Sequence, residues 1–242
     1  MALIDRFGRT IRYLRLSVTD RCNFRCAYCR PASGLALAER EEVLSDAEMV
    51  RLAGLFAGLG VGRFRLTGGE PLVRPGIVEL ARSLVALPGV EEITLSTNAS
   101  RLAELALPLR RAGVRRVNIS LDSLDPAIFS HVTRGGDLAA VLAGIDGALA
   151  AGLHPVKVNM VVMGGINDHE IPAMVEFARR RGVILRFIET MPVGEEGEEA
   201  MGRFFPASAI FQRLRDHFGG AREEEVSGPE GSGPARYLRV GG

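Results

Sequence analysis

Apolar stretches of strand length alternate along this chain with amphipathic stretches of helix length. The pattern predicts strands at 13–19, 62–67, 91–97, 114–121, 155–162 and 183–189. It predicts helices near 45–58, 75–87, 101–112, 137–151, 168–181 and 206–218. Ser45 followed by Glu48 has the spacing of a capping box and marks the start of the first helix. Six β–α repeats in series predict a parallel sheet with right-handed crossovers, which forms either a barrel or a doubly wound sheet.

Within the predicted strands, polar and apolar residues alternate. This holds in Leu14-Arg15-Leu16-Ser17, in Phe64-Arg65-Leu66-Thr67 and in Val156-Lys157-Val158-Asn159. Strands of a doubly wound sheet have helices on both faces, so they read as nearly continuous apolar runs. A sheet with one solvent-facing side also alternates, but parallel crossovers usually cover both faces. The alternation favours a barrel whose interior holds a polar ligand, and we expect a partial (β/α)6 TIM-type barrel that is open at one side.

The character of the sequence changes after residue 190. Glu195–Glu199 forms an acidic stretch, 227–234 is rich in Gly, Ser and Pro, and Tyr237–Val240 reads as a short strand. Nothing indicates a second independent domain. We expect one partial-barrel domain over 1–225 and the start of a truncated C-terminal region over 226–242.

Composition narrows the class of protein. The chain has 242 residues, is 47% hydrophobic and carries a net charge of +1, which gives no bulk field for nucleic acid. No apolar run is long enough for a membrane span and the N-terminus lacks a secretory signal, so we expect a cytoplasmic protein. Of the 30 basic residues only Lys157 is a lysine. Either this position requires the compact ammonium group of lysine, which arginine cannot imitate, or the presence of a lysine here is due to chance.

All three cysteines lie within one short segment, Cys22, Cys26 and Cys29, directly after the first predicted strand. Thiolates of this kind hold iron–sulfur clusters or zinc, and three ligands leave one metal position open for a substrate. A structural zinc site normally has four ligands, and the histidines lie far away in the sequence. Active sites of β/α barrels lie at the carboxyl ends of the strands. The segment therefore favours a catalytic iron–sulfur site, with a non-catalytic zinc module as the alternative.

The cysteine spacing, with Tyr28 just before the third cysteine, resembles the radical S-adenosylmethionine enzymes. The second strand ends in Gly68-Gly69-Glu70-Pro71, which resembles the segment that binds the methionyl amino group in that superfamily. The resemblance implies that the three cysteines hold a [4Fe–4S] cluster and that S-adenosylmethionine binds its open iron. One electron then cleaves the cofactor to a 5′-deoxyadenosyl radical, so no catalytic residue is expected beyond the cluster and the cofactor.

Five ordered motifs narrow the resemblance to the GTP 3′,8-cyclase family of molybdenum cofactor biosynthesis: Leu14–Asn23, Arg65–Pro71, Val117–Asp125, Val156–Asn159 and Leu185–Pro192. The resemblance implies a lyase-type conversion of GTP to 3′,8-cyclo-7,8-dihydro-GTP, begun by hydrogen abstraction from C3′. It implies S-adenosylmethionine contacts at Tyr28, Gly69, Ser120 and Met191. It implies GTP contacts at Arg15, Arg65, Ser96 and Lys157. It also suggests an electron-donor protein as a partner and leaves a homodimer open.

Two departures from the family pattern affect these expectations. Ser96-Thr97-Asn98-Ala99 stands where the family usually has Thr-Thr-Asn-Gly, so the turn after the third strand is uncertain. The family also carries a second cysteine triad that binds a further cluster, and this sequence has no cysteine beyond Cys29. We therefore expect a fragment or truncated form that binds one cluster and S-adenosylmethionine but cyclises little GTP. A single-cluster radical enzyme with another substrate is the alternative.

Overall fold

Six strands form one parallel sheet in the computed structural model, which describes residues 2–31, 33, 37–39, 42–191 and 201–219. Their order in the sheet equals their order in the chain: β1 (Tyr13–Ser17), β2 (Arg63–Thr67), β3 (Glu92–Thr97), β4 (Val114–Ser120), β5 (Val156–Val162) and β6 (Ile184–Glu189). A doubly wound sheet reverses its strand order in the middle, and this sheet does not. Within the described residues β1 and β6 are its two edges, so the prediction of an unclosed, partial barrel is confirmed.

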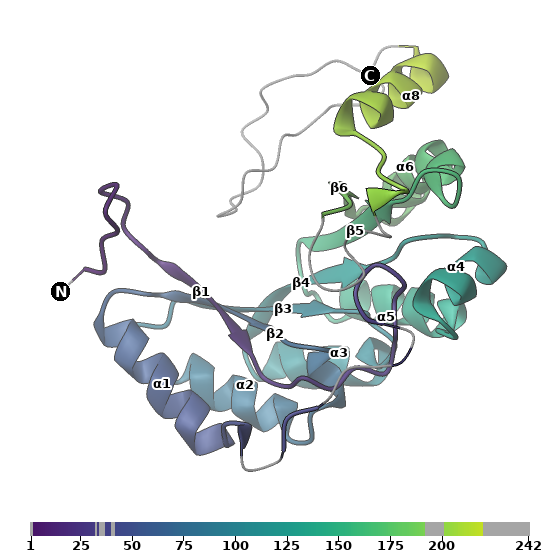
Figure 1. Ribbon diagram of the computed structural model, residues 1–242. Coiled ribbons are helices and arrows are strands. Elements are labelled where there is room, and N and C mark those ends of the chain that lie inside the picture. The colour runs from purple at the N-terminus through teal and green to yellow at the C-terminus, as the bar shows by residue number, and fades with distance from the viewer. Residues whose placement is uncertain (1, 32, 34–36, 40–41, 192–200, 220–242) are drawn as a thin grey trace.

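Helices follow the strands in the predicted order: α1 (Asp46–Gly58), α2 (Ile77–Val85), α3 (Leu102–Arg111), α5 (Leu138–Ala150), α6 (Ile171–Arg181) and α8 (Ala207–Phe218). Short 3₁₀ turns, η2 (Pro71–Val73) and η3 (Asp168–Glu170), precede α2 and α6. Figure 1 shows α1, α2, α3 and α5 along one side of the curved sheet. None of the described helices is long and apolar enough to cross a bilayer.

Among the described helices, α4 (Pro126–Thr133) is one that the hydrophobic pattern did not predict. Asp125 caps it by accepting hydrogen bonds from the backbone N–H groups of Ala127 and Ile128, and Pro126 occupies the first helical position, where no N–H is needed. Its eight residues are too few for a clear helical period. An Asp-Pro pair after a strand is the signal that could have found it.

The capping box at the start of α1 is confirmed. The Ser45 hydroxyl accepts from the backbone N–H of Glu48 at 3.3 Å, and the Ser45 N–H donates to the Glu48 carboxylate at 2.8 Å. These two bonds satisfy backbone groups that the first helical turn cannot pair internally. They fix the residue at which α1 begins, after the segment that contains the cysteines.

The two faces of the sheet differ as the alternation predicts. Leu66, Leu95 and Val117 are fully buried on the face that packs against the helices. The opposite face carries polar side chains in rows set by the strand register, and one row pairs Arg15 with Arg65, Arg65 with Thr94, and Thr94 with Arg116. The acidic stretch at 195–199, the segment at 227–234, the strand expected at 237–240 and the region 226–242 lie outside the described residues.

Candidate active site

The cysteine loop, defined here as residues 18–30, follows β1 at its carboxyl end and contains no helix or strand. Cys22 and Cys26 are partly buried, Cys29 is exposed, and all three are free thiols. The N–H groups of Cys29 and Arg30 both donate to the carbonyl of Cys26, at 2.9 and 3.1 Å, and close a tight turn between the last two cysteines. In the described part of the chain, no three His, Cys, Asp or Glu side chains gather closely enough to hold a single metal ion.

The surroundings of Cys22 and Cys26 disfavour their thiolates in the absence of metal. Burial raises the pKa of Cys26, and the carboxylate of Asp122 and the two other thiols raise it further. Burial also raises the pKa of Cys22. A bound cation supplies the positive charge that makes deprotonation favourable, as in metal-bound cysteines generally. The chemistry of this donor set fits a cationic iron–sulfur cluster.

The glycine segment after β2 packs directly on the cysteine loop. The N–H of Gly69 donates to the carbonyl of Thr19 at 2.7 Å, and the N–H of Glu70 donates to the carbonyl of Arg21 at 2.8 Å. A Cβ atom at Gly68 would lie 2.2 Å from the Thr19 carbonyl oxygen, and one at Gly69 would lie 2.2 Å from that of Arg21. Gly68 also has a φ of +144°. Only glycine permits this approach of two backbones.

Glu70 links this segment to the loop after β3. Its side chain is 1% exposed and accepts hydrogen bonds from the Thr97 hydroxyl at 2.6 Å and from the Asn98 N–H at 2.6 Å. Burial raises the pKa of this carboxyl group, while the hydrogen bonds favour its ionised form. Glu70 therefore fixes the ends of β2 and β3 relative to each other.

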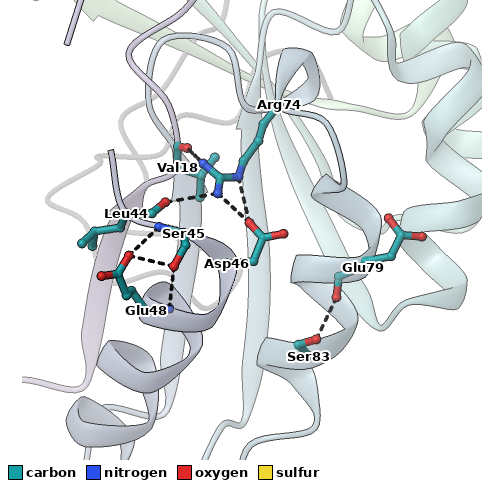
Figure 2. A network of polar contacts seen from close by, with 8 residues as sticks. All are labelled: Val18, Leu44, Ser45, Asp46, Glu48, Arg74, Glu79 and Ser83. Atoms are coloured by element: carbon teal, nitrogen blue, oxygen red, sulfur yellow. Dashed lines mark hydrogen bonds and ion pairs between the residues drawn. The ribbon is translucent and has the colours of Figure 1, made fainter. Parts of the chain in front are cut away.

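Arg74 ties together both ends of the connection between β1 and α1, as Figure 2 shows. Its Nη1 donates to the carbonyl of Val18 at 2.6 Å, and its Nη2 donates to the carbonyl of Leu44 at 3.2 Å. The same guanidinium forms an ion pair with Asp46 at 2.6 Å. Sequence reasoning missed Arg74, because one arginine among 29 carries no distinguishing local signal.

Tyr28 connects the cysteine loop, which follows β1, to the carboxyl ends of β4 and β5. Its hydroxyl donates to Oδ2 of Asp122 at 2.7 Å, and Oδ1 of Asp122 accepts the N–H of Val161 at 2.9 Å. Asp122 is 2% exposed, and burial raises its pKa to about 6. Burial and the neighbouring Asp122 also raise the pKa of Tyr28. Asp122 was not among the predicted site residues, although it lies two positions after Ser120.

The four positions implied for GTP all lie on the polar face of the sheet. Arg15 and Arg65 are register partners, and Asn118 stands between Ser96 and Lys157 in the next row. Arg65 donates from Nε to the Thr94 hydroxyl at 3.3 Å. The polar face also carries a cation that sequence reasoning did not select, Arg116, which forms an ion pair with Glu92 at 2.5 Å.

Lys157 has the most strongly shifted pKa among the basic residues of this face. It is 3% exposed, and burial lowers its pKa to about 8, with the positive charges of Arg186, Arg116 and Arg65 adding to the effect. Burial likewise lowers the pKa of Arg65. Cations held together in a poorly hydrated site gain stability when an anion joins them. The polar face is therefore suited to a polyanion.

The positions implied for S-adenosylmethionine all lie at or beyond the carboxyl ends of strands. Tyr28 and Gly69 belong to the contacts above, Ser120 is exposed at the end of β4, and Met191 follows β6 with 63% exposure. Near Ser120, its register partner Asn159 has a buried Oδ1 without a hydrogen-bond partner in the described residues. A buried acceptor of this kind costs about 1–3 kcal/mol unless a donor reaches it. This orphaned atom fits a site that is completed by a bound polar molecule.

The sequence is similar to those of known proteins. The sequence profile of the Radical SAM superfamily matches residues 16–178. A GTP 3′,8-cyclase of Hydrogenovibrio crunogenus is 48% identical over 243 residues, which cover 100% of this chain and 73% of the relative. GTP 3′,8-cyclase 1 of Pseudomonas aeruginosa is 49% identical over 237 residues, which cover 98% of this chain and 70% of the relative.

Two solved structures share the fold at low sequence identity. The structure of anSMEcpe with bound AdoMet gives a TM-score of 0.62 at 16% identity and covers 86% of this chain and 57% of that one. Coproporphyrinogen III oxidase from Escherichia coli gives a TM-score of 0.61 at 14% identity and covers 87% of this chain and 52% of that one. These likenesses concern the arrangement of strands and helices.

Proposed function

The chain belongs to the GTP 3′,8-cyclase family of the radical SAM superfamily, and on that basis we propose that it is a radical S-adenosylmethionine enzyme acting on GTP. The reaction is conversion of GTP to 3′,8-cyclo-7,8-dihydro-GTP, a step in molybdenum cofactor biosynthesis. One observation carries the proposal: a three-thiol loop lies at the carboxyl end of a sheet whose polar face holds a buried lysine, Lys157, near several arginines that are exposed or only partly buried.

Cys22, Cys26 and Cys29 are the residues that would hold one [4Fe–4S] cluster, with S-adenosylmethionine at its open iron. The chemistry that this pair supplies when bound is reductive cleavage of the sulfonium and hydrogen abstraction from C3′ of the ribose. The other residues of the proposed site position the cofactor. Gly69 keeps its backbone within hydrogen-bonding distance of Thr19, and Tyr28 is fixed by Asp122, so both proposed cofactor contacts are set before the cofactor arrives. Ser120 and Met191 complete the proposed set.

Arg15, Arg65, Ser96 and Lys157 are proposed to bind GTP. Arg15 and Arg65 present guanidinium groups, which match phosphate oxygens in geometry, and Lys157 adds a compact ammonium group. Because Arg186, Arg116 and Arg65 repel the charge of Lys157, a triphosphate among them relieves that repulsion and stabilises the protonated lysine. The ribose is then held at a fixed distance from the cofactor, which the reaction requires.

The proposal also covers an electron donor, the oligomeric state and the number of clusters. A one-electron donor of low potential, such as a small iron–sulfur or flavin protein, supplies the electron for cofactor cleavage. A homodimer is the proposed assembly, and sedimentation equilibrium tests it. We propose one cluster per chain, because the sequence holds three cysteines and all of them lie in the cysteine loop.

Anaerobic reconstitution tests the function. We expect about four irons per chain, as one [4Fe–4S] cluster requires. With dithionite, S-adenosylmethionine and GTP deuterated at C3′, we expect 5′-deoxyadenosine that carries deuterium, together with a low yield of cyclic product. Deoxyadenosine without deuterium, formed at the same rate with and without GTP, would indicate another substrate. About eight irons per chain, or full cyclisation, would contradict the single-cluster proposal.

A further inference from the structure

A side-chain amide from the loop after β3 faces the first cysteine. Nδ2 of Asn98 lies 4.0 Å from Sγ of Cys22 and 2.9 Å from Oδ1 of Asn23. The two asparagines are 75 residues apart in the sequence and approach because β1, β2 and β3 are neighbours in the sheet. Asn98 is partly buried, so solvent competes only in part for its N–H groups.

The orientation of the Asn98 amide follows from its other partner. Its Oδ1 accepts from the backbone N–H of Ser100 at 3.0 Å and from the Ser100 hydroxyl at 2.7 Å. A backbone N–H can only donate, so the amide oxygen must face Ser100 and the NH₂ group must face Cys22. Nδ2 of Asn23 donates to the Ser100 hydroxyl at 2.9 Å and closes a ring of three side chains, each of which donates to the next.

The backbone under Asn98 is also fixed. Its N–H donates to the buried carboxylate of Glu70 at 2.6 Å. The next residue, Ala99, stands where the family usually has a glycine, and it adopts the left-handed conformation that glycine favours, with a φ of 61°. Such a conformation costs an alanine roughly 1–2 kcal/mol. Ala99 is fully buried and its N–H donates to the Thr97 hydroxyl at 2.9 Å, so the surrounding contacts hold the turn in place.

The sulfur of Cys22 therefore has two N–H groups directed at it, the Asn98 amide and the backbone N–H of Phe24 at 3.4 Å. Hydrogen bonds to ligand sulfurs are among the factors that set the reduction potential of iron–sulfur clusters. Reduction adds one electron, taken from a low-potential donor, and makes the cluster one unit more negative without making or breaking a bond to the protein. N–H donors stabilise the more negative state, so their presence raises the potential.

We propose that Asn98 is a positioning residue that donates a hydrogen bond to the Cys22 sulfur and raises the reduction potential of the cluster. This inference rests on the proposed function, because it assumes the cluster. It assigns a role to the third residue of the Ser96–Ala99 turn. It also explains how the turn keeps its shape without a glycine: the ring of Asn98, Asn23 and Ser100 and the bond to Glu70 hold it.

The test is a redox titration of the reconstituted enzyme, monitored by electron paramagnetic resonance without S-adenosylmethionine. Asn98→Asp keeps the oxygen that Ser100 requires and directs a second, anionic oxygen at the sulfur. We expect the ratio of reduced to oxidised cluster at a fixed potential to fall about tenfold, which is about 59 mV for one electron. Asn98→Ala removes the donor without adding charge, so a smaller fall in the same direction is expected.

Ser100→Ala is the matched control. It removes a member of the ring but keeps the backbone N–H that orients Asn98, so its titration should follow the wild-type curve. Iron content and visible absorbance establish that each variant carries a cluster, and either Asn98 variant suffices for the test if only one assembles it. Asn98 variants with wild-type iron and a wild-type titration curve would overturn the inference while leaving the proposed function intact. A wild-type protein that assembles no cluster would overturn the proposed function itself.

Discussion

The cysteine loop and the polar face of the sheet are held in different ways. The cysteine loop has no helix or strand, and single contacts from distant segments hold it: Arg74 at Val18, Gly69 at Thr19 and Asp122 at Tyr28. The polar face is held by the register of six paired strands, which fixes each side chain through many backbone hydrogen bonds. A single substitution should therefore disturb the cysteine loop as a whole, whereas on the polar face it should remove only one charge.

The largest effect on iron content and activity is expected when a cysteine of the cysteine loop is replaced. Cys26→Ala removes one of the three proposed cluster ligands, and the sequence has no further cysteine to replace it. We expect the iron content to fall from about four per chain to near zero, with cofactor cleavage at the background of protein without iron. Anaerobic iron analysis and detection of 5′-deoxyadenosine measure both. Cofactor cleavage at the wild-type rate in this variant would refute the radical mechanism.

Arg74→Ala removes the contact that ties the start of the cysteine loop to the segment before α1. The guanidinium side chain is 14% exposed and pairs with the half-exposed carboxylate of Asp46, so its loss should cost about 2–3 kcal/mol of unfolding free energy. Cluster occupancy should fall by more than half, because Val18 and Leu44 lose their common partner. Urea unfolding and iron analysis provide the measurements.

Two further variants sharpen the test of Arg74. Arg74→Lys keeps the charge but not the fork of donors, so it should restore less than half of the lost stability. Arg82→Ala serves as the control, because Arg82 forms a long, exposed ion pair of 3.9 Å with Glu79, and its loss should change stability by less than about 0.5 kcal/mol. If Arg74→Ala and Arg82→Ala lost equal amounts of unfolding free energy, Arg74 would not be holding the cysteine loop.

Gly69→Ala tests the close approach of the glycine segment to the cysteine loop. The new Cβ would lie 2.2 Å from the Arg21 carbonyl oxygen, a backbone atom that cannot rotate away. The segments must separate, at a cost of about 1–3 kcal/mol. Gly58→Ala is the matched control: Gly58 ends α1, and apart from the backbone of α1 itself no described atom lies within 4 Å of the new methyl group, so stability should rise by about 0.5–1 kcal/mol. The same substitution should thus have opposite signs at the two sites in thermal unfolding.

The same contrast explains how much could be predicted from the sequence. Strand alternation has a local period of two, so it predicted all six strands within two residues and put Arg15, Arg65 and Lys157 on one face. The cysteine loop was predicted only in its chemistry. Its supports, such as Arg74 on Val18 or Asp122 on Tyr28, join residues 56 and 94 positions apart. No local period encodes such pairs, and the structure was needed to find them.

The smallest effect is expected on the polar face, where Lys157 can be tested by pH. Because its pKa is lowered to about 8, Lys157 is charged below that pH and becomes neutral above it. GTP affinity should therefore be constant below pH 8 and fall by up to about tenfold as the pH rises through that value, a change of about 1.4 kcal/mol. Isothermal titration calorimetry between pH 7 and 9 measures it.

Lys157→Met should bind GTP about tenfold more weakly at pH 7 and lose the pH dependence, since the titrating group is gone. Arg111→Met removes an equal charge from an exposed position on α3, outside the polar face, and should keep both the affinity and the pH profile of the wild type. Because the strand register rather than Lys157 holds the neighbouring cations, the loss should be confined to this one charge. A wild-type pH profile in Lys157→Met would assign the titration to another group, and a loss of folding stability above about 2 kcal/mol would break the contrast with the cysteine loop.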